Sequence, residues 1–155
     1  MRTICAISIL LLFASCDFNK VYEFNYDFPS DNWKQNQLLN FDFEVIDTSS
    51  YYNLFINIRN TPQYKYSNLY LFLTIAAPNA KHSTDTVECV LANNKGKWLG
   101  ESKINLLDNR ILYKKNIRFP IPGIYRVKYE QAMREESIAN IKNMGFRLEK
   151  TAYQE

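Results

Sequence analysis

The sequence has few of the residues on which most enzyme and cofactor motifs depend. Its 155 residues include one histidine, three cysteines and four glycines. The single histidine, His82, excludes the usual Ser-His-Asp triad and any metal site with several histidine ligands. The glycines, at positions 96, 100, 123 and 145, are too widely spaced for a phosphate-binding loop. We therefore expect no enzyme activity, no cofactor and no metal site.

The chain also lacks a strong excess of charge of either sign. Nineteen lysines and arginines stand against sixteen acidic residues, and the longest basic run is Lys114-Lys115. A nucleic-acid-binding protein of this size normally has a strongly basic face. We therefore do not expect nucleic acid as a partner.

The N-terminus has the layout of a secretory signal. Arg2 precedes an apolar stretch over 4–13, and the small residues Ala14 and Ser15 follow, directly before Cys16. About ten residues rising roughly 1.5 Å each cover about 15 Å as a helix, half of the roughly 30 Å of bilayer hydrocarbon. The stretch is therefore predicted to be a signal peptide over residues 1–15 and not a transmembrane helix.

The segment Phe13-Ala14-Ser15-Cys16 resembles a bacterial lipobox. This resemblance implies cleavage before Cys16, a thioether from Cys16 to diacylglycerol and acylation of the new amine. Two or three acyl chains anchor a protein firmly in a membrane, because each buried CH₂ group adds roughly 0.8 kcal/mol to the binding free energy. The alternative is that Cys16 merely follows an ordinary signal cleavage. We expect a lipidated tether over residues 16–19 and a single domain over 20–155, attached to the membrane through Cys16.

Only one cysteine then remains as a free thiol. Cys5 leaves with the signal and Cys16 is alkylated, so Cys89 has no partner for an internal disulfide. Cys89 lies in an alternating stretch, and we expect it to be a small buried residue and not a reactive thiol.

Alternating aliphatic and polar or aromatic residues predict β-strands throughout this chain. The clearest strands are 52–59 and 69–75, and the polar segment between them suggests a long hairpin. Further strands are predicted over 20–26, 41–46, 84–91, 103–107, 110–119, 123–131 and 146–150. Only the apolar residues of 133–143 have the spacing of a helix, and they predict one or two helical turns at most. The pattern predicts an all-β fold, an antiparallel β-sandwich of jelly-roll or immunoglobulin-like type, with at most one short helix near the C-terminus.

Four side chains are candidates for partner contact or for bracing loops. Trp98, between two glycines, could present its ring to a sugar or a partner, or fold back onto the core; Trp33, after a turn, has the same two alternatives. Arg59 and Arg134 lie at strand ends, where a guanidinium can brace a loop or meet a partner. We favour packing for the tryptophans and bracing for the arginines.

Seven short motifs follow one another along the chain: Tyr52-Asn53 with Ile58-Arg59-Asn60, Tyr66-Ser67-Asn68-Leu69-Tyr70, Asp85-Thr86-Val87-Glu88, Gly96-Lys97-Trp98-Leu99-Gly100, Gly123-Ile124-Tyr125, Glu130-Gln131-Ala132-Met133-Arg134 and Met144-Gly145-Phe146. In this order they resemble the gliding-motility lipoprotein H family of Bacteroidetes, over nearly the whole mature chain. The most specific combination is Gly-Lys-Trp-Leu-Gly followed by Glu-Gln-Ala-Met-Arg, after a lipobox.

The resemblance implies an envelope lipoprotein needed for surface gliding and linked to the motility and secretion machinery. It implies no catalytic activity, cofactor or active site. We therefore expect a non-catalytic binding or assembly component whose partners are other envelope proteins. Asp17 stands alone after Cys16, where surface-exported lipoproteins of that phylum have an acidic cluster, so we expect the outer membrane, facing the periplasm. The alternative is a carbohydrate-binding, or less readily a glycan-cleaving, envelope lipoprotein that uses Trp33, Trp98 and exposed tyrosines as stacking platforms.

Overall fold

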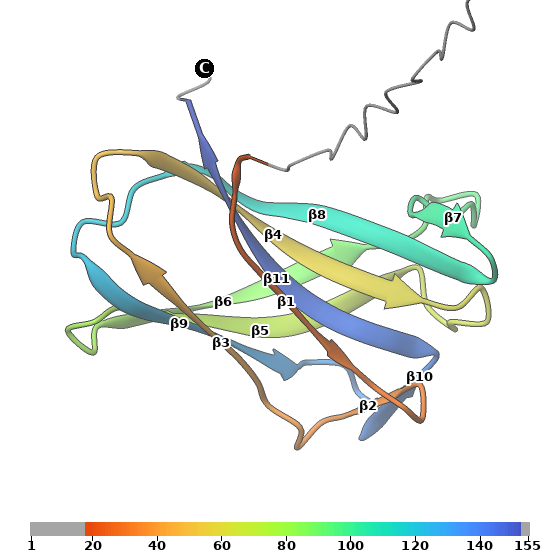
Figure 1. The fold of residues 1–155 in the computed structure, drawn as a ribbon. Coiled ribbons are helices and arrows are strands. Elements are labelled where there is room, and N and C mark those ends of the chain that lie inside the picture. Colours follow the sequence, from red (N-terminus) through yellow and green to blue (C-terminus); the bar gives the residue numbers. More distant parts are fainter. Residues whose placement is uncertain (1–17, 153–155) are drawn as a thin grey trace, which may run out of the picture.

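The structure, a computed structural model, describes residues 18–152, and every regular element in that range is a β-strand (Figure 1). The strands are β1 (Lys20–Asp27), β2 (Asn32–Lys34), β3 (Leu39–Val45), β4 (Tyr51–Asn60), β5 (Asn68–Ala76), β6 (His82–Val90), β7 (Glu101–Lys103), β8 (Leu106–Ile117), β9 (Gly123–Gln131), β10 (Ser137–Ala139) and β11 (Ile141–Thr151).

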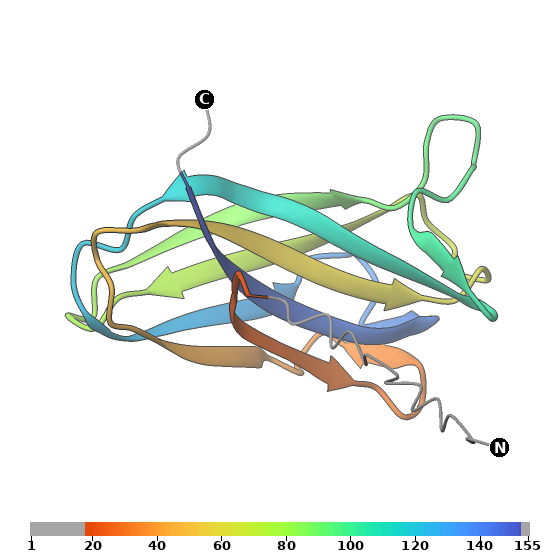
Figure 2. The same ribbon diagram turned by 45° about the horizontal axis from the view of Figure 1, so that its top comes forward.

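Two antiparallel sheets form the layers of a sandwich (Figures 1 and 2). The five-stranded sheet has the order β1-β11-β4-β8-β7, and the four-stranded sheet has the order β3-β9-β5-β6. A short ladder joins β2 to β10. The predicted antiparallel β-sandwich is confirmed.

The core lies between the inner faces of the two sheets, as the alternation predicts. On β4 the inward residues Tyr52, Leu54, Ile56 and Ile58 are buried, and on β5 the leucines at 69, 71 and 73 are fully buried. Each side chain of this size gains about 1.5–3 kcal/mol by leaving water. The two strands most clearly predicted from sequence therefore carry a large part of the core.

The predicted hairpin between 52–59 and 69–75 is wrong. β4 pairs with β11 and β8, whereas β5 pairs with β6 and β9, so consecutive strands belong to different sheets. The segment 61–67 crosses from one sheet to the other. Both strands bury one face against the opposite layer, which produces the same alternation as a hairpin.

The predicted helical turns over 133–143 are also wrong. Ile138 is buried in β10, which pairs with β2, and Ile141 begins β11. Between them Asn140 has a φ of 66°, in the left-handed region, and so reverses the chain between two strands. The apparent helical stripe is made of residues from two strands.

The turns gather at two ends of the sandwich, the N-terminal end and the Trp98 end. The N-terminal end comprises residues 18–20, the connections 46–50, 77–81 and 118–122, and the last residues of β11. These parts are joined by contacts: Lys150 Nζ lies 2.7 Å from Asp47 Oδ2, and Arg118 Nη2 donates to the Thr48 carbonyl at 3.3 Å. The Trp98 end comprises the connections 61–67, 91–100 and 132–136, at the opposite end of the strands (Figure 1).

Candidate functional site

A polar groove of about 340 Å³ lies on the outer face of the five-stranded sheet. Its lining includes Asn25 of β1, Asn143 of β11 and Asn57 of β4, three strands that are adjacent in the sheet. Successive residues on a strand point to opposite faces, so strands that bury apolar residues inward can present these amides outward. The groove is thus assembled from segments far apart in the sequence.

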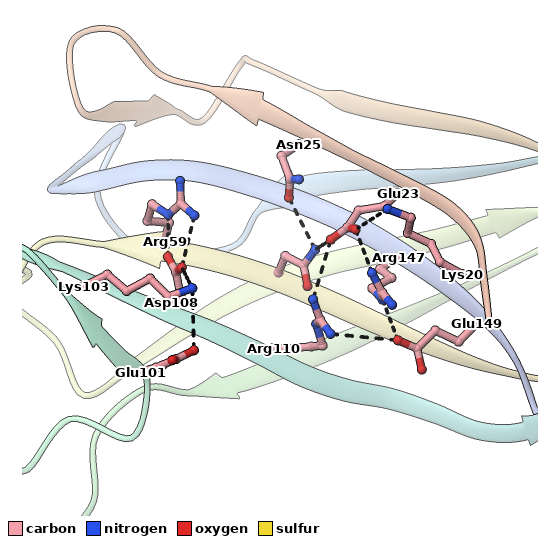
Figure 3. A network of polar contacts seen from close by, with 11 residues as sticks. Lys20, Glu23, Asn25, Arg59, Glu101, Lys103, Asp108, Arg110, Arg147 and Glu149 are labelled. Atoms are coloured by element: carbon pink, nitrogen blue, oxygen red, sulfur yellow. Dashed lines mark hydrogen bonds and ion pairs between the residues drawn. The ribbon is translucent and has the colours of Figure 1, made fainter. Parts of the chain in front are cut away.

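One side of the groove is an ion-pair cluster centred on Arg147 (Figure 3). The Arg147 side chain is only 3% exposed, and it bonds Glu23 at 2.7 Å and Glu149 at 2.5 Å. Arg110 lies within 3.8–3.9 Å of the same two carboxylates. Because a buried charge is tolerated only when it is paired and hydrogen-bonded, the two carboxylates are needed to keep Arg147 in place.

The other side of the groove contains Arg59, which faces Asp108 of β8 (Figure 3). The Arg59 guanidinium makes two hydrogen bonds to the Asp108 carboxylate, and Lys103 Nζ lies 3.2 Å from Asp108 Oδ2. These hydrogen bonds, from Arg59 first, lower the pKa of Asp108 against the opposing effect of burial. Arg59 thus links β4 to β8.

A close approach of two strands explains the glycine at position 145. A Cβ atom there would lie 1.8 Å from Asn25 Oδ1 and 2.8 Å from the Phe24 carbonyl oxygen. Asn25 lies over Gly145 and accepts a hydrogen bond from Asn57 at 3.4 Å, while Asn57 also donates to Glu23 at 2.9 Å. The absent side chain at 145 leaves room for this amide in the groove.

The loop around Trp98 is fixed by its own hydrogen bonds. Asn93 Oδ1 accepts from the backbone N–H groups of Lys95 and Lys97 at 2.9 and 3.0 Å, and Gly96 has a φ of 76°. The Trp98 ring packs against the core, 6.5 Å from the ring of Tyr64. The tryptophan therefore covers the core with part of its surface and leaves the rest accessible.

The other two candidates lie near the same end of the molecule. Trp33 is fully buried, stacks on Phe28 with ring centroids 6.0 Å apart and donates its indole N–H to the Gln37 carbonyl at 2.9 Å. It presents no ring face to a partner or a sugar. Arg134 is exposed in the connection from β9 to β10, beside Glu135, which accepts from Lys65 at 2.9 Å. The structure brings neither residue into the polar groove.

The described residues contain little that could drive a reaction. Cys89 is buried, and burial raises the pKa of its thiol to about 12. His82 is exposed on β6. Across residues 18–152 no three histidine, cysteine or carboxylate side chains are placed to share a metal ion. Over the same range no helix is long and apolar enough to cross a bilayer. Cys16 lies outside the described residues.

Sequence reasoning missed the polar groove. The only local signal was the outward set of polar residues on β11, Asn143, Arg147 and Glu149, which alternates with buried apolar ones. The partners of these residues come from β1, β4 and β8, and their proximity depends on strand pairing that sequence alone does not reveal.

Comparison with known proteins places the chain in a family. The sequence model described as GldH lipoprotein matches residues 20–148. The chain is 37% identical over 152 residues to a gliding motility lipoprotein GldH homolog of Christiangramia forsetii, which covers 94% of this chain and 93% of the relative. It is 32% identical over 153 residues to the gliding motility lipoprotein GldH of Flavobacterium johnsoniae, covering 94% of each. The predicted resemblance is confirmed, and the chain belongs to the GldH lipoprotein family.

Proposed function

We propose that this protein is a lipid-anchored component of a gliding-motility apparatus that works by binding other envelope proteins and not by catalysis. The observation that carries the proposal is the similarity, over 94% of the chain, to two proteins named gliding motility lipoprotein GldH or its homolog. The lipobox before Cys16 agrees with the lipoprotein part of those names. The resemblance found in the sequence also implies a link to the secretion machinery, and we extend the proposal to it.

The chemistry of the described residues supports a binding role. The charged side chains around the polar groove neutralise one another, and the one thiol is buried and protonated. Two apolar side chains that follow Trp98 in the chain are exposed: Leu99, its direct neighbour, is 57% exposed, and Ile104, in the turn between β7 and β8, is 96% exposed. Together with the accessible part of Trp98 they make a surface suited to a protein partner. We propose that the partner binds at the Trp98 end.

The proposed location is the outer membrane, facing the periplasm. Residues 1–15 would be removed as a signal, 16–19 would form the tether, and 20–155 would remain as one domain. Surface-exported lipoproteins of Bacteroidetes have an acidic cluster after the cysteine, so the lone Asp17 supports retention on the periplasmic side. Attachment to the membrane confines the search for a partner to the membrane surface and raises the effective concentration of that partner. A small contact area can then suffice for a stable complex.

In-cell cross-linking of the tagged protein, followed by mass spectrometry, tests the proposal. We expect an envelope protein to be recovered with the unaltered chain and to be lost with Leu99→Ser. Ile124→Ser, which removes an exposed residue of β9 next to the N-terminal end, is the matched control and should retain the partner. If no envelope partner is recovered after cross-linking, or if both variants retain it equally, the proposed binding role at this end is wrong.

The glycan-binding alternative loses one of its two tryptophan platforms. The Trp33 ring is buried, so of the two tryptophans only Trp98 could stack on a sugar, together with the exposed tyrosines. A glycan array probed with the Cys16→Ser protein separates the two functions. Tight sugar binding that Trp98→Ala abolishes would favour the alternative.

A further inference from the structure

The folded part of the chain begins very close to Cys16. The Asn19 carbonyl accepts a hydrogen bond from the Lys150 backbone N–H at 2.8 Å, so the chain is held against β11 from that residue onward. Asn19 is three positions after Cys16 in the chain, and each step spans at most about 3.6 Å. A lipid on Cys16 would therefore be attached within about 11 Å of the N-terminal end of the sandwich.

The Trp98 end is much farther away than this tether can reach. The twelve residues of β8 run from the Trp98 end to the N-terminal end, and at about 3.3 Å per residue they span roughly 40 Å. The start of β1 and the end of β11 lie well away from β7 (Figure 1). A bilayer that holds the lipid is therefore close to one end of the domain only.

The N-terminal end has side chains that suit a lipid surface. Lys81, Lys115 and Arg118 are exposed, and none of them makes an ion pair within residues 18–152. By contrast, Lys150 of the same end is paired with Asp47. Ile46, the first residue after β3 in the connection to β4, is 80% exposed. Arg118 also donates to the Thr48 carbonyl and lies over the Tyr51 ring, so no carboxylate neutralises its charge. Cations without a carboxylate partner beside an exposed aliphatic residue are typical of surfaces that contact anionic headgroups.

We propose that the N-terminal end of the sandwich rests on an anionic phospholipid surface, with Lys81, Lys115 and Arg118 toward the phosphates and Ile46 at the interface. The Trp98 end is then directed away from the membrane, where it is open to a protein partner. This inference rests on the lipid anchor of the proposed function. The inference specifies the end of the domain that meets the bilayer and the headgroup chemistry that this end recognises.

Collisional quenching by brominated lipids tests the orientation. The full lipidated protein, its lipid verified by intact mass, is reconstituted into vesicles of phosphatidylethanolamine and phosphatidylglycerol. A fluorophore is attached to Thr48→Cys at the N-terminal end or to Asn94→Cys at the Trp98 end. The native Cys89 does not compete, because it is buried and protonated. We expect quenching at position 48 to exceed that at position 94 by about threefold or more.

The charge contribution is tested by two matched triple variants. Lys81→Gln, Lys115→Gln and Arg118→Gln together should reduce quenching at position 48 by about half, as should omitting phosphatidylglycerol. The control replaces three exposed lysines near the Trp98 end, Lys34, Lys95 and Lys97, with glutamine and should leave quenching unchanged.

The outcomes separate this inference from the proposal beneath it. Equal quenching at both positions, or stronger quenching at position 94, would overturn the orientation. An equal effect of both triple variants would overturn the recognition of anionic headgroups. If intact mass shows no lipid on Cys16, the anchor itself is absent, and the failure belongs to the proposed function.

Discussion

The substitution Arg147→Met tests whether the ion-pair cluster on the outer sheet face stabilises the fold. Methionine keeps the length and apolar stem of the side chain but leaves the carboxylates of Glu23 and Glu149 without their central cation. Breaking a fully buried pair costs about 3–5 kcal/mol, and these carboxylates are about one-fifth exposed. Solvent screening reduces the expected loss in the free energy of unfolding to about 2–4 kcal/mol.

Urea unfolding of the Cys16→Ser protein, followed by tryptophan fluorescence, measures this loss. The matched control is Arg126→Met, because Arg126 bonds Asp42 with good geometry, at 2.6 and 2.7 Å, but is 58% exposed. We expect the control to lose only a small fraction of what Arg147→Met loses. If the two variants are destabilised equally, burial is not what makes the Arg147 cluster important, and the reasoning fails.

Three further changes test other parts of the structure. Gly145→Ala should destabilise the protein by about 1–3 kcal/mol in the same assay, because its Cβ would meet Asn25 and the β1 backbone; an unchanged midpoint would contradict the close approach. Cys89 should resist a thiol-reactive dye at about pH 8 and react fully in urea; fast labelling of the native protein would contradict its burial. Arg59 lowers the pKa of Asp108, so this pair stabilises the fold above the unfolded pKa of about 3.9 and loses that effect as the pH falls through the folded value. The stability difference between the unaltered protein and Asp108→Asn should therefore shrink from about pH 5 to about pH 2, and a constant difference would rule out this linkage.

The sequence was sufficient to predict which faces of the strands are buried. Each of the nine predicted ranges overlaps an observed strand, and the inward residues of β4 and β5 are those that the alternation selects. Alternation depends only on which side of a strand meets the core, so it is readable from one segment alone. The predicted range 103–107 nevertheless includes a turn, because Ile104 and Asn105 have positive φ values between β7 and β8.

The arrangement of neighbours could not be predicted in the same way. The segment 61–67 is long enough either to close a hairpin or to cross between sheets, and nothing in its composition distinguishes the two. β2 and β10 were missed because each has only three residues, too few for a two-residue period to be recognised. The polar groove depends on pairing among β1, β11, β4 and β8, whose segments are separated by as many as 124 positions in the Glu23–Arg147 contact.

The site residues illustrate the same limit. The sequence offered two alternatives for Trp33 and Trp98, and both rings pack against the core, Trp33 completely and Trp98 in part. Arg59 meets Asp108, a residue 49 positions away that no local pattern connects to it. Whether Trp98 and Arg134 also contact a partner stays a prediction.

The proposed function requires that the mature protein begin with a lipid-modified Cys16. Mass spectrometry of the intact protein, isolated from its own membranes, tests this most directly. We expect a chain that starts at Cys16 and carries a diacylglyceryl thioether with an acylated amine. A mass that corresponds to an unmodified thiol at Cys16, or to a chain that retains residues 1–15, would contradict it.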